Sequence, residues 1–254
     1  ALGERLSVTG ADEERAAITA KRRWILAEHL AETDEAWDFY RQLHEEAPDD
    51  AEVLEALARI AGARGETALA VEYLEGLAAR SSGTEAARYQ RRIAEVHEHA
   101  GDSDGTKAAL MRALDHDPED LEALSELRRM HTDAEDWRAL VGVLARETTV
   151  VTGDEQVQRY REIASVWEDR IGEPAVAMDA WRKVLDLAPD DATALEHLVG
   201  LSRSSEDWSA FTEYGQAWLR HAPAESRVAL QSELGQVFFK HLRREDEALR
   251  FLDA

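Results

Sequence analysis

The sequence has no cysteine, no asparagine and few residues that interrupt helices. Without cysteine the chain cannot form disulfide bonds, thiolate zinc sites or a cysteine nucleophile. It holds only 14 glycines and 5 prolines among 254 residues, and this scarcity of turn-forming residues argues against a β-sandwich, a β-barrel or a collagen-like chain. No run of about 18 apolar residues is present, so no segment is predicted to span a membrane.

Charge of one sign dominates, with 53 acidic against 30 basic side chains and a net charge of −23. Such an excess repels nucleic acid and anionic lipid, so neither is expected as a partner. The 44% of apolar residues suffices for a core, which excludes wholesale disorder. Among the basic residues, arginine greatly outnumbers lysine. This preference is typical of a GC-rich coding sequence and predicts a bacterial source.

A repeat with a period of about 71 residues runs through the chain, twice the length of a short helical repeat. Pro48, Pro118 and Pro189 recur at this interval, each within a similar acidic phrase. The phrase at residues 135–137 (Glu-Asp-Trp) returns one period later at residues 206–208. Residues 93–96 are echoed by residues 163–166, and residues 8–10 by residues 151–153. Four markers that keep one period predict a repeat protein rather than a single globule.

Apolar residues within each period follow helical spacing, whereas alternating strand patterns are nearly absent. Each period therefore holds four helices, or two helical hairpins of about 34–37 residues. The predicted helices are 12–31, 34–46, 51–63, 66–80, 85–100, 103–116, 120–132, 136–150, 155–171, 173–187, 191–203, 207–220, 224–242 and 245–253.

The hairpins resemble the tetratricopeptide repeat (TPR), a helix-turn-helix unit of about 34 residues. That family favours a small residue 12 positions before the proline that closes a unit and a large apolar residue 8 positions before it. The matching positions are Ala36 and Tyr40 before Pro48, Thr106 and Leu110 before Pro118, and Ala177 and Trp181 before Pro189. Thr106 departs from the small type. The family also favours a small residue at one position of the first helix. Ala94 and Ser165 match this preference, whereas Trp24 does not.

The resemblance implies an all-α, right-handed superhelical solenoid of antiparallel helical hairpins. We expect residues 1–254 to form a single TPR-like solenoid of about seven hairpins. Residues 1–9 match the tail of a second helix, and the helix that starts at Glu245 stops early at Ala254. The chain is therefore expected to be a fragment of a longer array that is cut within a repeat at both ends, with ends that can self-associate.

Candidate chemical sites are weak. His97 and His99 point about 200° apart on a helix, unlike the i, i+4 pairs that bind metals. The Asp102–Gly105 segment lacks the spacing of a calcium loop, because Ala113 stands where its glutamate belongs. No glycine-rich phosphate loop or serine elbow is present, and the tryptophans recur at the repeat period, which is typical of packing. We expect no enzyme, no cofactor and no metal.

The remaining candidate is a row of arginines on first helices. The resemblance implies that first helices line a concave groove that holds partner segments. The groove candidates are Arg59, Arg88, Arg91, Arg129 and Arg159, with Lys21, Arg203 and Arg227 at similar positions. They could hold an acidic or C-terminal peptide through charge-assisted hydrogen bonds, or each could pair with a neighbouring glutamate such as Glu155. The family's clamp of lysine and asparagine for C-terminal carboxylates is not carried over, since asparagine is absent.

The function expected from these features is a non-enzymatic protein-protein interaction scaffold that binds partner segments on the concave face. One alternative is a structural spacer or self-assembling rod. Another is the accessory region of an enzyme whose catalytic domain lies outside this segment. No targeting segment is visible, so the default compartment is the cytoplasm, and the partner is a protein or peptide rather than nucleic acid or membrane.

Overall fold

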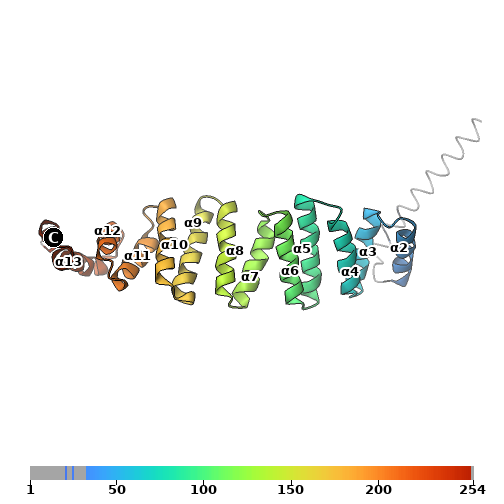
Figure 1. The fold of residues 1–254 in the computed structure, drawn as a ribbon, viewed down its shortest axis with the longest axis horizontal. Helices are drawn as coiled ribbons and strands as arrows, with labels where there is room; N and C mark the ends of the chain where they lie inside the picture. Colours follow the sequence, from blue (N-terminus) through green and yellow to red (C-terminus); the bar gives the residue numbers. More distant parts are fainter. Residues whose placement is uncertain (1–20, 22–24, 26–32, 253–254) are drawn as a thin grey trace, which may run out of the picture. The chain divides into compact units, whose positions relative to one another are not determined.

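The computed structural model describes residues 21, 25 and 33–252, and every regular element in this part of the chain is helical (Figure 1). The elements are α2 (Asp34–Glu46), α3 (Ala51–Ala63), α4 (Thr67–Ala78), α5 (Gly83–His99), α6 (Ser103–His116), α7 (Leu121–Asp133), α8 (Trp137–Val150), α9 (Asp154–Ser165), the π-helix η1 (Val166–Ile171), α10 (Pro174–Leu187), α11 (Ala192–Ser204), α12 (Trp208–Trp218), α13 (Ala224–Lys240) and α14 (Glu245–Leu252). The helix predicted over 12–31, including Trp24, and the predictions for residues 1–9 lie outside the described residues.

The helical hairpin is the unit of this architecture. The helices α3, α5, α7, α9, α11 and α13 are first helices of hairpins, and α4, α6, α8, α10, α12 and α14 are second helices. Successive helices pack against one another, as α3 with α4 and α5 with α6 do. The all-α solenoid of antiparallel hairpins predicted from the sequence is confirmed.

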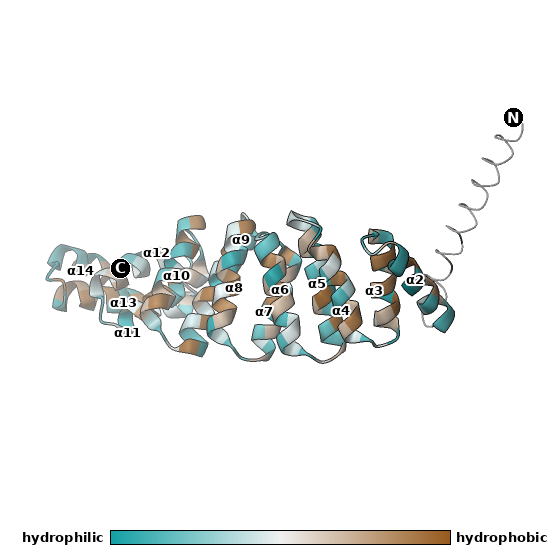
Figure 2. Ribbon diagram, turned by 45° about the vertical axis from the view of Figure 1, so that its right-hand side comes forward, coloured by the Kyte–Doolittle hydropathy of each residue, from teal (hydrophilic) through white to brown (hydrophobic). Residues whose placement is uncertain are grey.

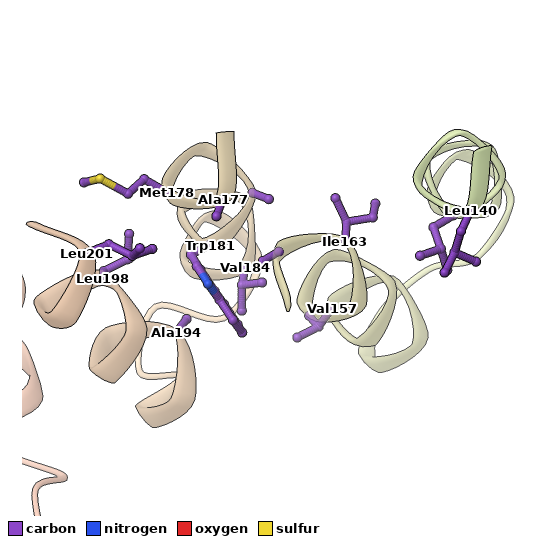
Figure 3. Close-up of a cluster of buried hydrophobic side chains, with 13 residues drawn as sticks. Leu140, Val157, Ile163, Ala177, Met178, Trp181, Val184, Ala194, Leu198 and Leu201 are labelled. Atoms are coloured by element: carbon purple, nitrogen blue, oxygen red, sulfur yellow. The ribbon is translucent and has the colours of Figure 1, made fainter. Parts of the chain in front are cut away.

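Contacts divide the described part of the chain into two compact units, one ending at Glu126 and the other beginning at Leu127. In the first unit, Tyr40 of α2 packs with Leu57 and Ile60 of α3. In the second unit, a larger core gathers around Trp181 of α10, which packs with Leu198 of α11 (Figure 3). Each unit thus buries its own apolar faces between helices, and Figure 2 shows hydrophobic and hydrophilic residues sharing the same helices, as such amphipathic packing requires.

The TPR packing positions are buried as the resemblance implies. The small residues Ala36 and Ala177 are fully buried, and the large residues Tyr40 and Trp181, eight positions before the prolines, are buried as well. Thr106, the departure from the small type, is also buried and satisfies its hydroxyl by donating a 2.8 Å hydrogen bond to the carbonyl oxygen of Asp102. A small side chain at this position lets neighbouring helices approach closely.

Every turn from a first to a second helix in the described chain contains one residue in the left-handed conformation. These residues are Gly65, Gly101, Glu135, Gly172, Glu206 and Arg243, with φ between 53° and 77°. The repeated Glu-Asp-Trp phrase is explained by this geometry. Its glutamate makes the left-handed turn, and its aspartate then caps the second helix by accepting a hydrogen bond from the backbone of Ala139 or Ala210. Glycine adopts this conformation with least strain.

Candidate functional site

The structure places the five candidate arginines on four first helices and pairs them within the chain. Arg59, Arg88 and Arg129 are exposed, whereas Arg91 and Arg159 are half-buried. Arg88 lies 3.9 Å from a carboxylate oxygen of Glu55, and Arg129 lies 3.6 Å from Asp133 one turn along α7. Arg59 also interacts with other groups of the chain.

Arg91 holds two first helices together. From α5 its Nε lies 2.9 Å from Oδ2 of Asp120, the residue before α7, and its guanidinium also contacts Glu122. The same contact recurs one period later, where Arg161 of α9 binds Asp191, the N-cap residue of α11. Arg161 was missed by the sequence reasoning, although it stands one repeat period after Arg91. These arginines act as links between neighbouring hairpins.

Arg159 belongs to a buried charge cluster in the second unit. Its guanidinium contacts Glu147 of α8, which is 2% exposed, and lies 3.5 Å from Glu162. Arg128 of α7 lies 3.3 Å from Glu147 and 3.6 Å from Glu162. The two guanidinium groups thus offset the desolvation cost that burial imposes on the ionised carboxylates of Glu147 and Glu162. Pairing with Glu155 on the same helix was one of the two alternatives for Arg159, and the structure instead places its guanidinium against Glu147 of α8 and Glu162 of α9.

A cavity of about 330 Å³ opens between α5, α6 and α7 within residues 91–126. Its floor is formed by the buried residues Ala94, Thr106 and Leu110. Its exposed rim carries four carboxylates, from Glu95, Glu98, Glu122 and Glu126, together with Ser125. Arg91 also lines the cavity, but it is bound to Asp120 and Glu122. The cavity therefore combines an apolar floor with a strongly negative rim.

The repeat relates this cavity to a filled position in the second unit. Leu110 corresponds to Trp181, since each stands eight residues before a unit-closing proline. The indole Nε1 of Trp181 donates a 2.8 Å hydrogen bond to Oε2 of Glu168, which corresponds to Glu98. The face of the same indole stacks on His197, which corresponds to Glu126. In the second unit, the planar N–H donor Trp181 therefore occupies the position at which the first unit has the smaller Leu110.

The other polar candidates have structural roles. Nδ1 of His97 lies 2.8 Å from Asp102 across the turn from α5 to α6, and Nδ1 of His131 lies 3.6 Å from Asp136 at the equivalent turn of the next hairpin. The backbone N–H of Gly105 donates to Asp102, and this hydrogen bond holds the pKa of the Asp102 carboxyl below its usual value. The segment from Asp102 is a helix start, as predicted.

Within the described residues, no group of three or more histidine, aspartate or glutamate side chains could hold a metal ion. In the same part of the chain, no helix has the length and apolar character needed to cross a membrane.

Comparisons with known proteins concern the fold. No protein-family model and no curated protein sequence matches the chain. The structure of YrrB, described as a TPR protein with an unusual peptide-binding site, is 12% identical over 66% of this chain and 83% of that chain, with a TM-score of 0.40. The C-terminal part of a TPR repeat-containing protein from Cytophaga hutchinsonii is 11% identical over 90% and 92%, also with a TM-score of 0.40.

A third structure is the complex of Naa15/Naa10 bound to HypK-THB. It matches 92% of this chain with a TM-score of 0.51 and 13% identity, and the chain spans 39% of that longer one. Identities this low establish a likeness of fold alone. The hairpin length, the buried small and large positions and the left-handed turns are those of a tetratricopeptide-repeat-like fold.

Proposed function

We propose that the chain is a non-enzymatic scaffold that binds segments of a partner protein on the face formed by its first helices. We call this the first-helix face; the five candidate arginines lie on the first helices α3, α5, α7 and α9, and the cavity opens between α5, α6 and α7. The observation that supports the proposal most is that cavity, because a hollow of about 330 Å³ with an apolar floor and charged rim is of the size and composition that side chains of a partner occupy.

The framework behind this face suits a docking role. Arg91 and Arg161 link successive first helices through Asp120 and Asp191, and Arg203 of α11 binds Glu233 of α13 with distances of 2.8 and 2.6 Å. Links of this kind fix the spacing between hairpins before a partner arrives. A preformed surface loses less conformational entropy on binding than one that orders with its ligand.

The row of arginines remains part of the proposed surface. Because its members are paired with carboxylates of the chain, an acidic partner segment would have to compete for them, which favours weak and salt-sensitive contacts. The double variant Arg88→Glu with Arg129→Glu replaces two exposed arginines of the row. It leaves the ion pairs of Arg91 and Arg159 intact. Loss of partner binding in this variant, at unchanged helicity, is the result expected if these arginines hold an acidic segment.

Site-specific crosslinking tests the docking face directly. A photoreactive phenylalanine analogue is placed at Ser125, on the cavity rim, and in a matched protein at Ala108, which is exposed on the second helix α6. We expect partner peptides to crosslink at Ser125 in an extract of the source organism and not at Ala108. Equal crosslinking at both positions, or none at Ser125, would contradict a scaffold that binds through its first helices.

A further inference from the structure

The cavity between α5, α6 and α7 is a hollow whose rim charges are largely engaged within the chain. At the rim, Glu122 contacts the guanidinium of Arg91. Glu98 and Glu126 also interact with other groups of the chain. A cationic guest would have to displace these internal partners, whereas a neutral guest leaves them in place. The charges at the rim therefore favour a neutral side chain that covers the apolar, buried floor.

The second unit shows which neutral side chain fits a position of this kind. There, Trp181 stands where the first unit has Leu110. The other two floor residues of the cavity correspond to Ala164 and Ala177, and both lie in one buried cluster with Trp181 (Figure 3). The second unit thus places its own indole on the floor that the first unit leaves open beside Leu110.

An indole that enters the cavity also finds an acceptor for its N–H. In the second unit, Oε2 of Glu168 accepts a hydrogen bond from Nε1 of Trp181 at 2.8 Å and lies 2.9 Å from Nδ1 of His197. One carboxylate oxygen thus serves two nitrogen neighbours, and a whole carboxylate offers about four acceptor positions. Glu98, the counterpart of Glu168, therefore has room to accept an indole N–H while it keeps its interaction within the chain.

We propose that this cavity binds the indole of a tryptophan in the partner segment, in the place that the second unit fills with Trp181. This inference rests on the proposed function as a scaffold and names the partner side chain that the first-helix face selects. The indole lies on Leu110 and Ala94, and its N–H donates a hydrogen bond to Glu98. The volume of about 330 Å³ is at the small end of the range of ligand pockets, roughly 300–1,000 Å³, as suits one side chain.

The test uses the full chain labelled with 15N and an acetylated, amidated pentapeptide that has tryptophan flanked on each side by glycine and alanine. Matched probes carry phenylalanine, leucine or arginine at the centre. We expect the tryptophan peptide to shift amide signals of α5, α6 and α7. It should bind at least tenfold more tightly than the leucine peptide, which buries less area, and than the arginine peptide, which must compete for engaged carboxylates. The phenylalanine peptide should bind several-fold more weakly, since it has no N–H.

Three variants make the test specific. Leu110→Trp installs the side chain of the second unit and should weaken binding of the tryptophan peptide at least tenfold, because its own indole occupies the cavity. The matched control Met111→Trp adds the same side chain at the next position of α6, which is 60% exposed and outside the cavity, and should change binding less than twofold. Glu98→Leu removes the acceptor and should reduce the preference for tryptophan over phenylalanine. Amide spectra verify that each variant is folded.

The inference is overturned if the tryptophan peptide does not bind, or if the phenylalanine, leucine or arginine peptide binds as tightly. It is also overturned if Met111→Trp weakens binding as much as Leu110→Trp, or if Glu98→Leu keeps the full preference for tryptophan. Partners that still crosslink unchanged at Ser125 in Leu110→Trp would overturn the inference and leave the scaffold itself standing. Absence of any crosslinked partner contradicts the scaffold, whereas the titration still decides whether the cavity recognises tryptophan.

Discussion

Trp181 and His197 stack with ring centroids 4.4 Å apart, and both place a nitrogen on the same carboxylate oxygen of Glu168, at 2.8 and 2.9 Å. Trp181 is 1% exposed, so its N–H needs this acceptor. Glu168 lies in the π-helix η1, whose widened turn follows α9. π-Helical turns are frequently found at functional sites. Here the π-helix carries Glu168, the acceptor for the N–H of the buried Trp181.

Replacing Trp181 tests how much this arrangement contributes to stability. We expect Trp181→Leu to lower the free energy of unfolding by about 2–4 kcal/mol, because it removes buried aromatic area, leaves a cavity and breaks a buried hydrogen bond. Urea titration followed by circular dichroism measures the change. The reciprocal variant Leu110→Trp enters an existing cavity, so a loss as large as that of Trp181→Leu would show that the two positions are not equivalent.

Glu147 is expected to contribute more to the free energy of unfolding than a more exposed glutamate does. We expect Glu147→Ala to cost about 1.5–3 kcal/mol, since it removes the buried counterion of Arg128 and Arg159 and leaves them only Glu162. In the matched control, Glu233→Ala removes the partner of Arg203 from a largely exposed pair and should cost under about 1 kcal/mol. Similar losses in the two variants, measured by chemical unfolding, would argue against the buried charge cluster.

Two glycines in second helices are expected to respond to alanine in opposite ways. A Cβ at Gly105 would clash with the carboxylate of Asp102 and with Nδ1 of His97, so Gly105→Ala should separate this pair and destabilise the chain. A Cβ at Gly142 meets nothing within 4 Å, and Gly142→Ala should stabilise by about 0.5–1 kcal/mol through helix propensity. Melting temperatures of the two proteins should therefore move in opposite directions.

Stability should fall in acid partly through Glu55. Its burial raises the pKa, but the hydrogen bond and charge of Arg92, with Nη1 at 2.6 Å, and the charge of Arg88 bring the pKa of Glu55 below its usual value. A carboxyl with a lower pKa when folded contributes stability above the unfolded value, and the contribution disappears as the pH falls through the folded value.

The matching variant is Glu55→Gln, which removes the titrating group and keeps the shape. The difference in unfolding free energy between the unaltered chain and Glu55→Gln should be under about 1 kcal/mol near pH 7 and should shrink as the pH is lowered from 5 to 3. Chemical unfolding at several pH values measures it. A difference that stays constant across this range would contradict the assigned ion pair with Arg92.

The sequence by itself determined the helices and their repeat. The predicted ranges 34–46, 51–63 and 103–116 coincide with α2, α3 and α6, because apolar spacing, aspartate caps and closing prolines are local signals. It also placed the small and large packing residues, such as Ala177 and Trp181, since these recur at a fixed distance from a proline. The single helix predicted over 155–171 is instead α9 followed by η1, as helical periodicity does not distinguish an added π turn.

Only the tertiary structure decided which side chains meet. The sequence offered pairing of each arginine with a neighbouring glutamate, whereas the structure binds Arg91 to Asp120 and Glu122 at α7. Contacts between hairpins join residues far apart in the chain, and with 53 acids composition cannot select among them. The cavity beside Leu110 was likewise absent from the pattern, because it arises from what two neighbouring first helices and one second helix leave unfilled.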